Sequence, residues 1–178
     1  MAQSALALSR VYRLLEPGPV VLVTTANRRR DNVMTLSWHL MMEFTPPLVG
    51  FVLSARNYSF SLLAESRQCV INIPTRPLAR KVVACGNRSG RRGDKFAAVG
   101  LTRLPSKYVL PPRIGECYAS LECRVADARL VGRYNFFVLE VVQAWLDRSV
   151  ARPRTLHHMG RGRFMVAGDV IALPSRKM

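Results

Sequence analysis

Residues 32–39 read N-V-M-T-L-S-W-H. From Thr35 onward the polarity alternates strictly, with Thr35, Ser37 and His39 on one side and apolar residues on the other. A period of two predicts a β-strand with one face in a core. The polar side carries two hydroxyls and an imidazole, which either face water or line a pocket.

The sequence around this stretch predicts further strands with short connections. Residues 20–25 are typical of a buried strand, and Thr45-Pro46-Pro47 should end the opening strand because proline cannot donate to a ladder. We therefore expect an antiparallel meander over 20–54, with strands at 20–25, 32–44 and 48–54.

The remaining sequence predicts strands with short helices between them. Helices are expected at 6–15, 56–66, 77–86 and from about Asp94, and strands at 69–74, 117–131, 134–147 and 164–166. Strands dominate, and neither a linker nor an internal repeat is evident. The sequence therefore predicts one mainly β domain over residues 1–178, a barrel or sandwich with inserted short helices.

The charge balance is strongly basic, with 27 Lys and Arg against 11 Asp and Glu and a net charge of +16. Such a balance favours anionic partners: phosphates, nucleotides, nucleic acid or an anionic surface. For individual arginines, a solvated basic surface is the alternative explanation. The chain is also 49% apolar, which excludes a disordered tail and allows a sizeable core.

The cysteine and histidine patterns predict no metal site. None of the four cysteines forms a C-x-x-C pair, and His157-His158 lacks a spaced carboxylate or cysteine partner. The N-terminus is a poor signal peptide, and no apolar run reaches the roughly 18 residues that a membrane span needs. We expect a cytoplasmic protein with reduced thiols and no membrane span.

Six pieces of sequence occur in a characteristic order: N-V-M-T-L-S-W-H, P-P-L-V-G-F, R-N-Y-S-F-S-L-L, C-V-I-N-I-P, C-G-x-x-S-G-R-x-x-D-K-F-A-A-V-G-L and E-C-Y-A-S-L-E-C. Together they resemble the flavin reductase-like family, the flavoredoxin type of FMN-binding split β-barrel, over about residues 15–147. This resemblance implies a Greek-key barrel, a homodimer, and FMN bound near the dimer interface.

The chemistry of FMN is consistent with these residues. Its dianionic phosphate, polar ribityl chain and flat ring require cations, hydroxyls or amides, and backbone groups beside the ring. By resemblance, the opening strand runs alongside the flavin, whereas His39 could lie past the ring. The residues expected to contact the cofactor there are Asn32, Met34, Thr35, Leu36, Ser37 and Trp38.

The turn before the helix at 56–66 is expected to bind the phosphate. A helix N-terminus offers unpaired backbone donors, and Arg56 could add a bidentate contact. By resemblance, Lys95 is the family's phosphate-side lysine, while Asp94 is better explained as a helix cap. The expected residues are Ser54, Arg56, Asn57, Tyr58, Ser59 and Lys95.

Two more cofactor contacts are implied by resemblance. Tyr134, at the head of the strand expected at 134–147, takes a family position that is often a histidine reaching the flavin. Phe164 is expected to cover the ring from the partner subunit.

The leading hypothesis is an FMN-dependent oxidoreductase that takes hydride from NADH or NADPH and passes electrons to a small-molecule or protein acceptor, with no catalytic acid or base. One alternative is a basic nucleic-acid-binding barrel, motivated by the arginine clusters at 28–30 and 88–92. Those clusters lack interleaved aromatics, so no specific nucleic-acid partner is expected. The other alternative is a barrel that binds flavin without reductase activity.

Overall fold

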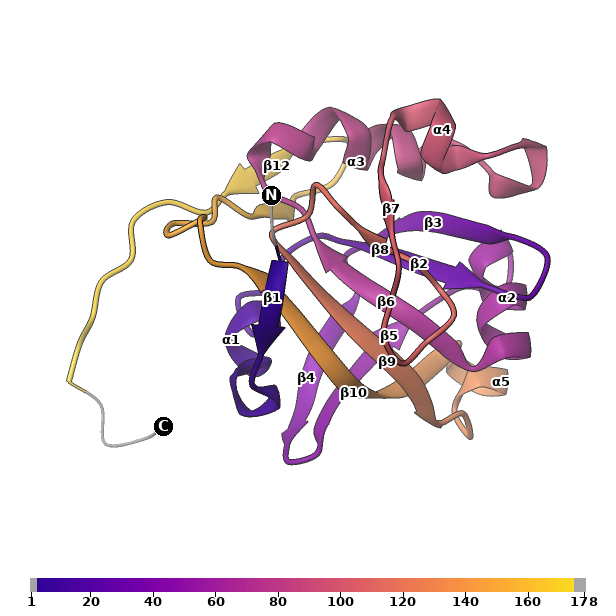
Figure 1. Ribbon diagram of the computed structural model, residues 1–178, viewed down its shortest axis with the longest axis horizontal. Coiled ribbons are helices and arrows are strands. Elements are labelled where there is room, and N and C mark those ends of the chain that lie inside the picture. Colours follow the sequence, from indigo (N-terminus) through magenta and orange to yellow (C-terminus); the bar gives the residue numbers. More distant parts are fainter. Residues whose placement is uncertain (1–2, 175–178) are drawn as a thin grey trace.

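A computed structural model describes residues 3–174 of the protein (Figure 1). Seven antiparallel strands follow the order β3-β2-β6-β9-β10-β5-β4, and an eighth, β1, also pairs with β10. This mainly β sheet curls into a split barrel, which confirms the predicted fold class. The strands are β1 (Gln3–Leu6), β2 (Val21–Ala26), β3 (Asp31–Leu36), β4 (His39–Phe44), β5 (Pro47–Val52), β6 (Gln68–Ile73), β9 (Ala119–Asp127) and β10 (Phe136–Asp147).

Short helices and two small hairpins decorate this barrel. Figure 1 shows α3 and α4 on one side of β2 and β3, with β12 beside α3. The helices are α1 (Tyr12–Leu15), α2 (Tyr58–Ser66), α3 (Ala79–Gly86), α4 (Lys95–Val99) and α5 (Val131–Tyr134), with 3-10 turns at Leu8–Arg10, Arg76–Leu78 and Gly90–Arg92. The small hairpins pair β7 (Arg103–Leu104) with β8 (Arg113–Ile114), and β11 (Leu156–His158) with β12 (Phe164–Val166).

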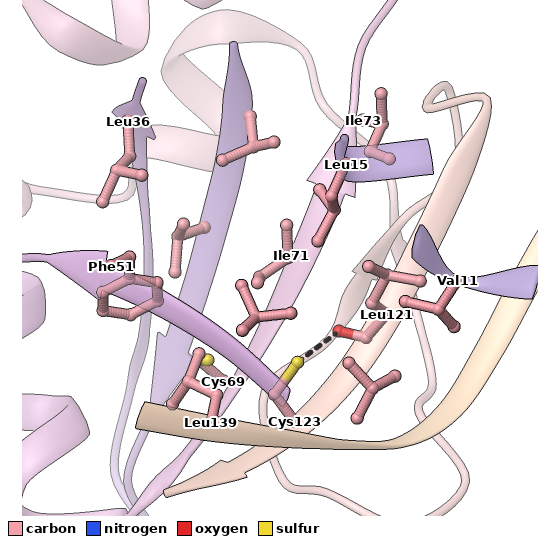
Figure 2. Close-up of a cluster of buried hydrophobic side chains, with 14 of the residues drawn as sticks. Val11, Leu15, Leu36, Phe51, Cys69, Ile71, Ile73, Leu121, Cys123 and Leu139 are labelled. Carbon is pink, nitrogen blue, oxygen red and sulfur yellow. Dashed lines mark hydrogen bonds between the residues drawn. The ribbon is translucent and has the colours of Figure 1, made fainter. Parts of the chain in front are cut away.

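Two hydrophobic clusters hold the fold together. The larger one fills the barrel, where Figure 2 shows Phe51, Ile71, Leu121 and Leu139 pointing toward one another from four strands. The smaller one joins β2 and β3 to α3, α4 and the β11–β12 hairpin. Burying each large apolar side chain contributes about 1.5–3 kcal/mol. The second cluster therefore fixes α3 and α4 against β3.

The predicted continuous strand at 32–44, and with it the meander over 20–54, is wrong. β3 ends at Leu36 and β4 begins at His39, and these two strands lie at opposite ends of the sheet order. Because the chain changes sheet partner here, Leu36 is buried in the barrel, whereas Trp38 and Leu40 are 73% and 51% exposed. The alternation of polarity continues through a break in the strand.

Two local predictions also need correction. The helix expected at 6–15 is replaced by β1, a 3-10 turn and α1, because residues 3–6 pair with β10. The strand expected at 134–147 begins at Phe136, and Tyr134 instead ends the short helix α5. Asn135, with φ 54°, separates the helix from the strand. Between residues 3 and 174, no helix is both long and apolar enough to cross a membrane.

Candidate functional site

Two adjoining pockets follow the outer edge of β3. The cation pocket, about 300 Å³ in volume, lies between β3, α2, the end of α3 and the loop that leads to α4. The hairpin pocket, about 290 Å³, lies between the end of β3, α3 and the β11–β12 hairpin. Both are lined by Gly86 and Asn87, so they are neighbours. Since β3 ends the sheet order, its outer edge faces these pockets instead of another strand.

The cation pocket gathers Lys95, Arg56 and Arg88, and none of the described residues that line it is an acid. Lys95 is only 6% exposed, and no carboxylate within residues 3–174 lies in salt-bridge range of its amine. Burial therefore lowers the pKa of the Lys95 ammonium, and the nearby Cys85 opposes this only in part. A buried ammonium without a counter-ion is costly, so an anionic ligand would stabilise it.

The N-terminus of α2 adds backbone donors to the same pocket. Its N-cap residue, Asn57, has an extended backbone and makes no side-chain cap bond. Within the part of the chain that the structure describes, the backbone N–H groups of Tyr58 and Ser59 have no partner. These groups lie at the positive end of a nine-residue helix, which is a favourable position for an anion.

Asn32 presents an unused acceptor at this site. Its Nδ2 donates to Ser59 Oγ at 2.8 Å, which joins β3 to α2. Its Oδ1 is buried and has no hydrogen-bond partner among the described residues. Gly90 approaches closely, because a Cβ at that position would lie 2.0 Å from Asn32 Oδ1. The pocket wall therefore requires a glycine here and leaves an acceptor for a ligand hydroxyl or amide.

Arg103 holds together the two elements that position Asn32 and Lys95. Its guanidinium donates to both carboxylate oxygens of Asp31, at 2.7 and 2.8 Å, and to Asp94 at 2.8 Å. Asp31 directly precedes Asn32. Asp94 directly precedes Lys95 and caps α4 by accepting from Ala97 N at 3.2 Å, which confirms its predicted role as a cap. The hydrogen bond from Arg103 is the main cause of the lowered pKa of Asp94.

The hairpin pocket has a more mixed lining. The Thr35 hydroxyl donates to Val82 O at 2.6 Å, so it ties β3 to α3 at the pocket wall. Across the pocket, the His158 and Phe164 rings lie 5.3 Å apart on the β11–β12 hairpin. The hairpin is held in place where Val20 N donates to Leu156 O at 2.6 Å.

The structure brings most of the predicted site residues together. Seven line the cation pocket: Asn32, Met34, Arg56, Asn57, Tyr58, Ser59 and Lys95. Four line the hairpin pocket: Thr35, Leu36, Ser37 and Phe164. Phe164 does so within its own chain, whereas it was expected to reach the ring from a partner.

Three predicted site residues line neither pocket. Trp38 lies on the surface beyond β3. Tyr134, which is 53% exposed, ends α5 with the Arg133 guanidinium over its ring. Ser54 accepts from Arg56 N at 3.3 Å and so supports the turn that carries Arg56. His39 also lies outside: its Nε2 donates to Pro19 O at 2.6 Å.

Sequence reasoning missed part of both walls. The loop after α3 lines the cation pocket with Arg88, Ser89 and Gly90, and its sequence G-N-R-S-G carried a family motif without an assigned role. His158 lines the hairpin pocket, although neither histidine of the His157-His158 pair had been given a function. Among residues 3–174, no group of three or more potential metal ligands is arranged to hold an ion.

Several known proteins are similar to this chain in sequence or in fold. A protein from Archaeoglobus fulgidus is 36% identical over 113 residues, which make up 64% of each chain. The reductase component of a 4-nitrophenol 4-monooxygenase/4-nitrocatechol 2-monooxygenase from Rhodococcus opacus is 30% identical over 82% of this chain and 72% of that protein.

Among solved structures, an FMN-binding domain of a flavin reductases-like enzyme from Shewanella baltica superimposes with a TM-score of 0.92. It is 27% identical and the match covers 97% of this chain and 98% of that one. The model of the flavin reductase like domain matches residues 12–166. The chain therefore belongs to the flavin reductase-like family of split β-barrels.

Proposed function

We propose that this protein binds FMN along the outer edge of β3, with the phosphate in the cation pocket and the ring beside the end of β3 in the hairpin pocket. The observation that carries this proposal is the buried ammonium of Lys95, which has no carboxylate partner among residues 3–174 and lies in a pocket with Arg56 and Arg88. A dianionic phosphate would supply the missing negative charge.

The other groups in the two pockets suit the rest of the cofactor. The free N–H groups of Tyr58 and Ser59 suit phosphate oxygens, and the unpaired Oδ1 of Asn32 suits a ribityl hydroxyl. Each pocket lies at the lower end of the size range of ligand sites, so an elongated ligand such as FMN would occupy both. The edge of β3 then offers backbone groups to the ring.

We further propose that the protein is an oxidoreductase of the flavin reductase type, with NADH or NADPH as donor and a small molecule or a protein as acceptor. The relative from Rhodococcus opacus, a reductase component, supports this assignment. When bound, the flavin supplies the hydride and electron chemistry. The chain's residues bind and orient it, and Thr35, fixed on Val82 O, keeps β3 in place against α3.

The absorption spectrum of the purified protein tests both FMN binding and reductase activity. A yellow protein, or one that takes up added FMN with a changed visible spectrum, supports the binding site. Bleaching by NADH or NADPH in anaerobic stopped-flow mixing supports reductase activity, and its absence in an FMN-loaded protein leaves a flavin-binding barrel. A protein that ignores FMN, FAD and riboflavin refutes the whole proposal.

We also propose that the protein is a homodimer. β4 ends the sheet order, and its side chains at Leu40, Met42 and Phe44 are 51%, 45% and 54% exposed. An exposed apolar edge strand is a liability unless a second chain covers it. A monomeric mass by sedimentation at micromolar concentration, with flavin bound, would contradict this proposal.

A further inference from the structure

Two apolar features of the chain have no role in the pockets. The first is the β4 stripe, defined as Trp38, Leu40, Met42 and Phe44. The second is the C-terminal arm, defined as residues 167–174, which follows the β11–β12 hairpin. An exposed apolar strand edge and an exposed apolar segment in one chain raise the question of whether they bind each other.

The C-terminal arm leaves the body of the protein. Figure 1 shows it running outward from the β11–β12 hairpin, apart from the barrel. Ala167 N donates to Thr155 O at 2.9 Å, but beyond that bond residues 168–174 make no backbone hydrogen bond within the described chain. Val170, Ile171 and Leu173 are 93%, 77% and 75% exposed. The arm therefore offers both apolar side chains and unpaired backbone groups.

The β4 stripe offers the complementary edge. Within residues 3–174, β4 pairs with β5 alone and so ends the sheet. At one end of the stripe α1 packs nearby, and the Tyr12 ring lies 5.0 Å from the Phe44 ring, edge to face. Met42 lies over Gly50 of β5, where an added Cβ would come within 2.9 Å of the Met42 sulfur. The Phe136 ring of β10 also packs over Gly50, at 2.3 Å from the place of an added Cβ, so Gly50 makes room for Phe136 and Met42 on this face. Addition of an extended segment to such an edge is a common mode of recognition.

The charge distribution favours a second copy as the occupant. Residues 31–55 and 164–174 contain no lysine or arginine, although the chain has 27 of them and a net charge of +16. Because both copies are strongly positive, they repel each other over most of their surfaces. This repulsion is weakest where the two segments without lysine or arginine meet. Asp169 is the single charged residue within 167–174, and it is negative; Arg176 and Lys177 follow this stretch in the sequence.

We propose that the C-terminal arm of one copy binds along the β4 stripe of a second copy, and that the exchange is reciprocal. This inference rests on the proposed homodimer. Eight residues reach about 26 Å when extended, and the six residues of β4 span about 20 Å, so the arm is long enough to cover the strand. A two-fold axis then gives two identical contacts and leaves neither arm exposed.

Cross-linking tests the proposal directly. All four native cysteines are buried free thiols, so newly introduced surface thiols can be oxidised selectively. We would co-express differently tagged Val170→Cys and Met42→Cys chains and oxidise the purified mixture mildly. A disulfide-linked dimer carrying both tags is expected. Leu130→Cys, at a similarly exposed position before α5, replaces Met42→Cys in the control and should link several-fold less.

A single chain that carries both Val170→Cys and Met42→Cys separates the two possible contacts. If its cross-link forms within one chain, the arm binds its own body and the proposal is wrong. Cross-linking no stronger than that of the Leu130→Cys control also overturns it.

Shortening the arm gives a second measurement. A chain that ends at Ala167 keeps both pockets, and its dimer dissociation constant in sedimentation should rise at least tenfold. Ile171→Asp should weaken the dimer in the same direction, without any truncation. An unchanged dimer in both variants refutes the exchange. FMN uptake is measured in parallel: a full-length chain that fails to take up FMN refutes the proposed cofactor but leaves the test of the arm unaffected.

Discussion

Replacing Lys95 by methionine should lower the affinity for FMN and, at the same time, stabilise the protein without ligand. Methionine is close in length to lysine but uncharged, so the buried space stays filled. A charge-assisted hydrogen bond contributes about 1.5–3 kcal/mol, which corresponds to a loss in FMN affinity of about tenfold to a hundredfold or more. The affinity for riboflavin, which has no phosphate, should hardly change.

The second half of this prediction has the opposite sign. Lys95 is 6% exposed and no acid pairs with it among the described residues, so the folded protein bears the cost of a desolvated charge. Lys95→Met removes that cost, and the melting temperature of the ligand-free protein should rise by a few degrees. If Lys95 only supported the fold, its replacement would lower both the melting temperature of the ligand-free protein and the affinity for FMN.

The assay combines fluorescence titration with FMN and riboflavin and thermal unfolding without ligand. Lys107→Met is the control, because Lys107 is exposed and lies outside both pockets. It reports the small, non-specific effect of removing one positive charge from a basic protein. If both variants weaken FMN equally, or if Lys95→Met weakens riboflavin as much as FMN, the phosphate assignment is wrong.

Three further predictions follow from polar contacts. Arg103→Lys keeps the charge but cannot bridge Asp31 and Asp94. In titrations the affinity for FMN should therefore fall more than the affinity for riboflavin. An unchanged ratio of the two affinities would exclude a positioning role for Arg103. Glu122→Gln should cost about 3 kcal/mol or more in urea unfolding, because the buried carboxylate accepts from two backbone N–H groups and an indole N–H; a loss below 1 kcal/mol would contradict this. Burial lowers the pKa of His39 from 6.5, so the neutral form is favoured in the folded state. Stability should then be full above pH 6.5 and fall as the pH drops below it, and His39→Gln should flatten this loss between pH 7 and 5.

Most residues that line the cation pocket were expected from the sequence and its family resemblance, because they come in short local runs. Asn32 and Met34 lie on one strand, and Arg56 to Ser59 form one turn before a helix. Turn and helix signals of this kind act within a few residues, so a sequence reveals them directly. The wall formed by Arg88, Ser89 and Gly90 and the buried state of Lys95 required the structure, since they depend on how the loop after α3 and α4 pack against β3.

The remaining features depend on contacts between distant segments, which a local pattern cannot report. Residues 3–6 form a strand because they pair with residues 144–147, although the following sequence favours a helix. Trp38 was assigned to the site by resemblance, and the alternation past Leu36 predicted a continuous strand; a period of two does not show that a strand has changed its sheet partner. His158 reaches the hairpin pocket only through the pairing of β11 with β12.

The split in the barrel explains why one stretch of sequence serves two purposes. A closed barrel has no strand edges, whereas here β3 and β4 both end the sheet order and are joined by two residues, Ser37 and Trp38. The edge of β3 is enclosed by α2, α3 and the hairpin, so its free backbone groups face pockets that can hold a cofactor. The edge of β4 pairs with no second strand within residues 3–174; α1 packs nearby with Tyr12 against Phe44, and Leu40, Met42 and Phe44 are exposed apolar residues. Because the two edges are only two residues apart in the chain, a partner that orders β4 would also fix the end of β3, which couples the proposed dimer to the proposed flavin site.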